Sequence, residues 1–116
     1  MSLQIFGTKK CAATRKAERF FKERDVDYQF VDLADKGISP GELKAVIKAL
    51  GKDGLLDPGS KRYVDRGLKY MDYDLEEEIL ADPLLMRTPV VREGSLAVIG
   101  DDAGAWAQFA ASAKAG

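Results

Sequence analysis

The side chain best suited to chemistry in this sequence is its single cysteine, Cys11, because the 116 residues include no histidine. One cysteine excludes an intrachain disulfide. The lack of histidine excludes a Cys–His dyad, a Ser–His–Asp triad and any histidine-ligated metal. Catalysis must therefore use a lone thiol, carboxylates, hydroxyls, lysines or arginines, and no metal site is predicted.

The residues around Cys11 favour a reactive thiolate. Cys11 follows a short apolar segment that stops at Gly7, and it directly precedes a predicted helix whose first amides are unpaired. Such amides lower the pKa of a thiol, and Thr14 could donate its hydroxyl to the sulfur from the first turn. Four side chains add positive charge nearby: Lys9, Lys10, Arg15 and Lys16. A single cysteine can also be a small buried hydrophobe, but the polar residues before Cys11 are atypical of a core position.

A second candidate group is Arg87-Thr88-Pro89, at the head of an apolar run. Arginine binds carboxylates and oxyanions well because its planar guanidinium can donate two parallel hydrogen bonds. Pro89 could simply start an edge strand, or it could form a cis peptide bond that shapes a tight corner beside a site. The sequence alone leaves both alternatives open.

Apolar spacing and helix caps predict the elements that position these groups. Strands are predicted at residues 3–6 and 28–31, with a helix between them from about Cys11 to Arg24 or Asp25. Ser39 and Glu42 predict a capping box that opens a helix, which Gly51 ends. Asp74 and Glu77 predict a second capping box, and the stretch 55–73 between the two helices is predicted as a loop with one short helix.

The C-terminal third predicts a β-hairpin followed by a helix. The hairpin strands are residues 88–92 and 96–99, joined by Glu93-Gly94-Ser95. Asp101 or Asp102 could cap the last helix. The predicted order is therefore βαβ, a helical insertion, a hairpin and a C-terminal helix, which is a mixed α/β sheet in one domain of residues 1–116.

Charge and hydropathy limit which partners and which cellular compartment are expected. Lysine and arginine number 18 against 19 acidic residues, so the formal net charge of −1 argues against a nucleic-acid binder driven by bulk positive charge, and no DNA partner is predicted. The sequence shows no export signal and no apolar stretch of membrane-spanning length. A cytoplasmic location without a membrane partner is expected.

The sequence resembles the family of arsenate reductases and Spx-type regulators, which have the thioredoxin fold. Three segments carry the resemblance: residues 5–17 around Cys11, residues 38–43 at the helix opening, and residues 82–91, which contain Arg87-Thr88-Pro89. The run 96–100 before the last helix also fits. A strand–cysteine–helix start combined with a downstream Arg-x-Pro is fairly specific to this family.

The resemblance implies roles for these residues. Cys11 would be the nucleophile toward an oxyanion or a disulfide sulfur, Arg87 would hold the anion, and Pro89 would be the cis-proline that faces the thiol. Thr14 is expected to assist Cys11. The anion site is expected to include four further residues: Lys9, Lys10, Arg15 and Thr88.

The sequence also departs from the family pattern. The family has an arginine at the position where this sequence has Asp57-Pro58-Gly59, and Lys61 and Arg62 follow slightly later. A second family arginine is also missing, near the position of Asp101. Thr14 occupies the place of the second cysteine of a disulfide-switched regulator, so that switch is excluded.

A monothiol mechanism fits these residues. We expect a monomeric, arsenate-reductase-like thiol oxidoreductase that needs no bound cofactor and uses glutathione as a cosubstrate or a glutaredoxin as a partner. The first alternative is a non-catalytic, Spx-like regulator that docks on a protein partner such as the transcription machinery. The second is a protein that binds glutathione without turnover.

Overall fold

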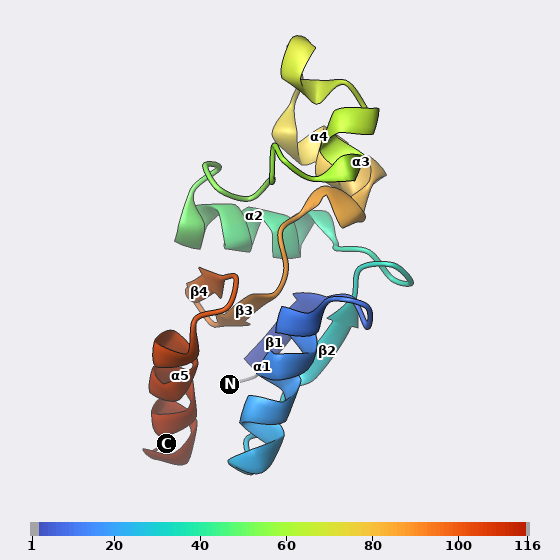
Figure 1. Cartoon of the computed structure of the whole chain (residues 1–116). Coiled ribbons are helices and arrows are strands. Elements are labelled where there is room, and N and C mark those ends of the chain that lie inside the picture. The colour runs from blue at the N-terminus through green and yellow to red at the C-terminus, as the bar shows by residue number, and fades with distance from the viewer. Residues whose placement is uncertain (1–2, 116) are drawn as a thin grey trace.

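The structure is a computed structural model that describes residues 3–115, with side chains described to residue 113. Its centre is a four-stranded mixed sheet in the order β2-β1-β3-β4 (Figure 1). β1 (Leu3–Gly7) and β2 (Gln29–Asp32) are parallel and are joined by α1 (Ala12–Glu23). This confirms the predicted βαβ start of a mixed α/β sheet.

The hairpin completes the sheet. β3 (Val90–Glu93) pairs antiparallel with both β1 and β4 (Leu96–Ile99). The connecting turn is Gly94-Ser95, because Glu93 pairs with Leu96 at the end of the ladder instead of lying in the turn as predicted. The register of β3 on β1 sets Val90 opposite Phe6, so the segment before β3 runs past the end of β1 that leads to Cys11.

α2 (Pro40–Leu50) begins where the sequence predicts. Ser39 Oγ accepts a hydrogen bond from Glu42 N at 3.1 Å, and Glu42 Oε1 accepts one from Ser39 N at 3.0 Å, so the predicted capping box is complete. Gly51 ends α2 with a φ of 80°, a conformation that glycine adopts without a steric penalty.

The helical insertion between α2 and β3 holds more structure than the predicted loop with one short helix. It contains α3 (Lys61–Asp65), the 3₁₀ turn η1 (Leu68–Tyr70), α4 (Leu75–Ala81) and η2 (Pro83–Leu85). Asp74 caps α4 by accepting a hydrogen bond from Glu77 N at 3.1 Å, which is one half of the predicted box. These elements lie at one end of the long axis of the molecule, which measures 46 Å (Figure 1).

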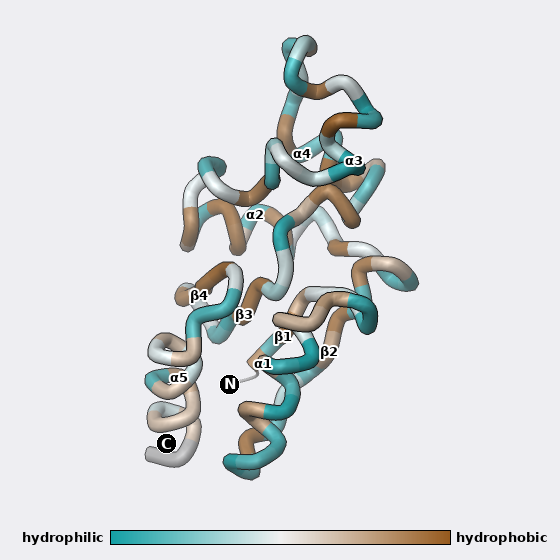
Figure 2. The backbone as a smooth tube through the Cα atoms, in the orientation of Figure 1, coloured by the Kyte–Doolittle hydropathy of each residue, from teal (hydrophilic) through white to brown (hydrophobic). Residues whose placement is uncertain are grey.

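Two apolar cores lie on opposite faces of the sheet. Phe6 and Val90 face α2 and the insertion, whereas Ile5 and Val91 face α1 and α5 (Ala103–Ala115). This separation follows from the alternation of side chains along a strand. Figure 2 shows β4 as an apolar segment and α1 as a largely hydrophilic helix, as expected of a surface helix that buries one stripe.

Asp102, and not Asp101, caps α5, because Asp102 Oδ1 accepts a hydrogen bond from Ala105 N at 3.1 Å.

Among residues 3–115, every helix is too short or too polar to cross a bilayer.

Candidate functional site

Cys11 lies at the start of α1, as the sequence predicts. It is the N-cap residue, with an extended backbone at φ −79° and ψ 118°. Its amide donates to Thr8 O at 3.2 Å, and its carbonyl accepts from Arg15 N at 3.1 Å. This turn after β1 fixes the backbone of Cys11 and leaves its side chain half-buried at the end of the helix where amides are unpaired.

The thiol meets the loop that enters β3. Thr88 Oγ1 lies 3.1 Å from Cys11 Sγ and donates a hydrogen bond to it, and Sγ lies 3.8 Å from Thr88 O. The peptide bond between Thr88 and Pro89 is cis, so the prediction of a cis-proline beside the thiol is confirmed and the simple edge-strand alternative is wrong. The pairing of β1 with β3 brings these two distant segments together.

The surroundings of Cys11 favour its thiolate form. Burial alone would raise the pKa of the Cys11 thiol, but the hydroxyls of Thr14 and Thr88 and the amides of Thr14 and Ala13 together lower this pKa below its ordinary value. The Thr14 hydroxyl makes no hydrogen bond of normal geometry within the described residues. We therefore regard Thr88 as the principal side-chain donor to the sulfur.

Thr14 is held against the end of β1. Its side chain is fully buried, and a Cβ placed on Gly7 would overlap its Oγ1 and Cγ2 atoms. Gly7 thus allows the first turn of α1 to approach β1 closely. The sequence predicts the proximity of Thr14 to the sulfur but gives no indication of this packing.

Arg87 lies next to Thr88, but its side chain is exposed and extends to the loop before Leu55. Its Nη1 atom is 3.4 Å from Gly54 O, and its amide donates to Leu55 O at 2.8 Å. The guanidinium is exposed to solvent, its side-chain contact is with Gly54, and its role as anion clamp stays a prediction.

The basic residues expected around Cys11 differ in whether their charged groups already have a partner. Lys9 and Lys10 are exposed. Arg15 donates from Nη1 to Lys9 O at 3.3 Å. Lys16 pairs with Asp101 at 3.0 Å, which partly cancels the positive charge that the sequence suggests at this end of α1.

The departures from the family pattern are also visible in the structure. Arg62, a possible substitute for a missing arginine, is paired with Asp82 at 3.0 Å. Asp57 accepts a hydrogen bond from Gly59 N at 2.9 Å within its own turn. Within the described residues, no group of three or more acidic or cysteine side chains is arranged to hold a metal ion.

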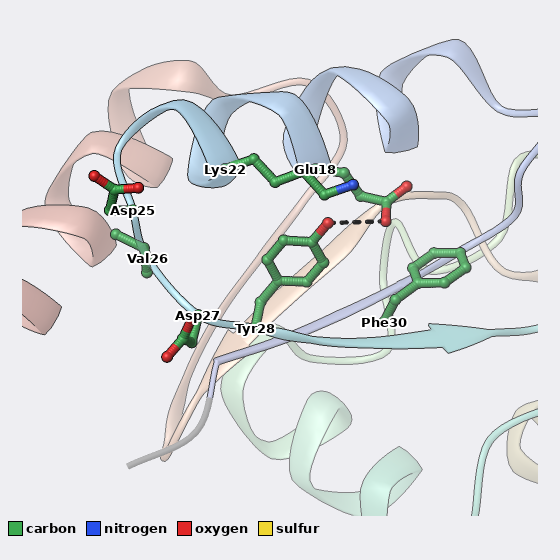
Figure 3. Close-up of a pocket in the computed structure, with 7 residues that line it drawn as sticks. All are labelled: Glu18, Lys22, Asp25, Val26, Asp27, Tyr28 and Phe30. Atoms are coloured by element: carbon green, nitrogen blue, oxygen red, sulfur yellow. Dashed lines mark hydrogen bonds between the residues drawn. The ribbon is translucent and has the colours of Figure 1, made fainter.

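A separate pocket of about 450 Å³ lies at the other end of α1 (Figure 3). Its residues come from the second half of α1 and from the segment that enters β2. Tyr28 donates from its hydroxyl to Glu18 at 3.0 Å, and burial together with the Glu18 carboxylate raises the pKa of Tyr28 to about 12. This pocket is distant from the thiol, so its size does not make it the candidate catalytic site.

The sequence predicts Thr88 as an anion-binding residue but does not predict its contact with the sulfur. The only available indication was its position directly before the expected cis-proline. The ion pair of Lys16 with Asp101 was also missed, because it joins α1 to the start of α5 across 85 residues of sequence.

Comparisons with known proteins bear on the fold and the family of this chain. No family model matches the chain. The global transcriptional regulator Spx 2 of Bacillus anthracis is 25% identical over 101 residues, which are 83% of this chain and 77% of that protein. An arsenate reductase from Vibrio cholerae superposes with a TM-score of 0.80 at 19% identity, covering 93% of this chain and 97% of its own.

The protein YffB superposes with a TM-score of 0.81 at 24% identity, covering 92% of this chain and 97% of its own. At these identities the solved structures establish the thioredoxin-like fold. Together with the sequence similarity to Spx 2, they confirm the predicted resemblance of this chain to the arsenate reductase and Spx-like family.

Proposed function

We propose that this protein is a monothiol oxidoreductase in which the Cys11 thiolate exchanges disulfides with glutathione. The hydrogen bond from Thr88 Oγ1 to Cys11 Sγ, at the start of α1, is the observation that carries the proposal. It holds the sulfur at the end of the helix where a negative charge is stabilised.

The chemical step needs one cysteine only. The Cys11 thiolate attacks one sulfur of a disulfide substrate, the substrate S–S bond breaks, and the departing thiolate takes a proton from water. A glutathione thiolate then attacks the mixed disulfide and restores the Cys11 thiolate. In a second exchange, another glutathione thiolate attacks the glutathione sulfur of the released glutathione–substrate disulfide, that S–S bond breaks, and the remaining substrate thiolate leaves and takes a proton from water. Two glutathione molecules are thereby oxidised to one disulfide while the substrate disulfide is reduced to two thiols.

The charges beside the thiol support an anionic cosubstrate. Glutathione carries carboxylates, and Arg87, Lys9 and Lys10 are exposed around the loop that holds Cys11. Arginine binds a carboxylate through charge-assisted hydrogen bonds. A nucleophile flanked along the chain by exposed cationic residues suits such a cosubstrate.

Mass spectrometry after incubation with glutathione disulfide tests the proposal. The wild-type protein is expected to gain one glutathione, which added glutathione then removes, and Cys11→Ser is expected to gain none. Arg87→Ala should slow the reaction with glutathione disulfide while leaving the rate with neutral iodoacetamide unchanged. An unmodified wild-type protein, or equal slowing with both reagents, would contradict the proposal.

A second candidate function is that of an Spx-like, protein-binding regulator. Two observations favour it: the 25% identity to Spx 2 and the acidic residues Asp57 and Asp101 near the positions of the missing arginines. Co-purification with wild type and with Cys11→Ser separates the candidates, because a pure regulator keeps its protein partner without the sulfur. The lack of a DNA partner stays a prediction.

A further inference from the structure

β4 is the strand at one edge of the sheet (Figure 1). In an antiparallel ladder, alternate residues of a strand bond to the neighbouring strand. Gly100 N donates to Pro89 O at 2.8 Å, so alternate positions back along β4 also bond to β3. The N–H and C=O groups of Ala97 and Ile99 therefore point away from β3, and within residues 3–113 they have no hydrogen-bond partner.

An apolar groove of about 200 Å³ runs beside this edge, between β4 and α5. Leu96, at the start of β4, is 63% exposed although it is a large apolar side chain. The α5 residues of the groove are spaced three and four apart, so they form one helical face. The lining comprises Leu96, Val98, Ala105, Gln108, Phe109 and Ser112, together with Glu93 and Ala97 from the two hairpin strands.

Both the edge and the groove suit an extended peptide. The groove is smaller than the ~300–1,000 Å³ of ordinary small-molecule sites, so it fits a side chain better than a cofactor. The β4 sequence, Leu96-Ala97-Val98-Ile99, contains no charged residue and no proline. Charged residues and proline usually prevent an exposed edge strand from pairing with another chain, and β4 lacks both.

Acidic residues flank the edge at both ends. Glu93 precedes the hairpin turn, and Asp102 follows β4. Asp102 uses Oδ1 to cap α5, and its side chain is exposed. A peptide strand with basic residues at both ends would therefore complement this edge.

We propose that β4 binds an extended segment of a partner protein as a fifth strand, apolar at alternate positions and basic at both ends. One apolar side chain of the segment enters the groove beside α5, while its backbone bonds to Ala97 and Ile99. A second copy of this chain fits less well, because antiparallel pairing of two β4 strands brings Glu93 of each copy near the acidic end of the other. The proposal goes beyond the thiol chemistry and does not depend on it.

Fluorescence anisotropy with a labelled peptide of alternating valine and threonine, with lysines at both ends, tests this docking. Ala97→Pro removes an outward-facing N–H without removing a bond to β3, and edge strands tolerate such a proline. We expect it to weaken binding at least about tenfold, and hydrogen exchange at Ala97 and Ile99 to slow when the peptide binds to the wild type. The rate of Cys11 alkylation reports whether the variant keeps its fold.

Two matched arginine variants on α5 test the docking even if Ala97→Pro does not fold. Gln108→Arg fills the groove and repels the basic peptide, whereas Ala107→Arg adds the same charge away from the groove. The first should weaken binding and the second should not. A glutamate-ended peptide should also bind more weakly. Equal peptide binding by both arginine variants, or no peptide binding to the wild type, would overturn the proposal. Concentration-dependent self-association of the wild-type protein that Gln108→Arg abolishes would also overturn it.

Discussion

At the scale of single residues, the thiol owes its character to donors from two distant segments. The Thr88 hydroxyl donates to Cys11 Sγ, and together with the nearby Thr14 hydroxyl and the first amides of α1 it lowers the thiol pKa by more than burial raises it. Sequence patterns predict the donors at the start of α1, because a strand, a turn and a helix start are local features. They do not predict the Thr88 contact, because it depends on β3 pairing with β1.

Thr88→Val should reduce the nucleophilicity of Cys11 near neutral pH. The substitution removes the hydroxyl donor at 3.1 Å, so the thiolate loses stabilisation and the thiol pKa rises. We expect the rate of alkylation by iodoacetamide at pH 7 to fall about fivefold, the effect of a typical single hydrogen bond. Ser95→Ala, in the exposed turn of the hairpin, is the control and should keep the wild-type rate.

The same shift makes folding stability depend on pH. The pKa of Cys11 is lowered in the folded state, so its ionisation adds stability above the unfolded value of ~8.5 and loses it as pH falls through the folded pKa. The unfolding free energy of wild type minus that of Cys11→Ser should therefore increase as pH rises toward 8.5 and then level off. Urea unfolding at several pH values measures this difference, and a decrease with pH would contradict the assigned sign.

At the scale of elements, the site depends on the close approach of β1 to the first turn of α1. Gly7 provides the space for Thr14, and both residues are buried. The sequence marks Gly7 only as the end of a strand. Its packing role appears once the strand and the helix are placed in three dimensions.

Gly7→Ala should therefore disturb both stability and the thiol. The new methyl group overlaps the Thr14 side chain, and overpacking of this kind costs about 1–3 kcal/mol. We expect a lower midpoint in urea unfolding and slower alkylation of Cys11. Adding Thr14→Ala removes the overlapping atoms, so the double variant should regain stability relative to the sum of the two single effects. Simple additivity would show that the two positions do not contact.

In the molecule as a whole, the two apolar cores pack against opposite faces of the sheet that carries the site. Trp106 of α5 is fully buried, and its ring packs edge-on to Phe20 of α1 with centroids 5.7 Å apart. The sequence predicts the order of elements and the apolar faces of α1, α2 and α5. It does not predict the strand order β2-β1-β3-β4 from local patterns, and the helical insertion is under-predicted because its helices are only five to seven residues long.

Trp106→Ala should be among the most damaging single substitutions. Truncating a buried tryptophan costs about 3–5 kcal/mol. Trp106→Phe should cost less, because it keeps an aromatic ring and removes an indole N–H that has no partner within the described residues. Thermal unfolding followed by circular dichroism measures both variants. Leu96→Ala, at an exposed position, is the control and should stay within about 0.5 kcal/mol of wild type.

The pH dependence of the alkylation rate of Cys11, the only thiol in the chain, shows whether this fold activates the sulfur. A thiolate held by the start of α1 and by Thr88 should titrate with a midpoint below the ~8.5 of a free cysteine. A midpoint at or above that value would contradict the activation of Cys11 by this fold.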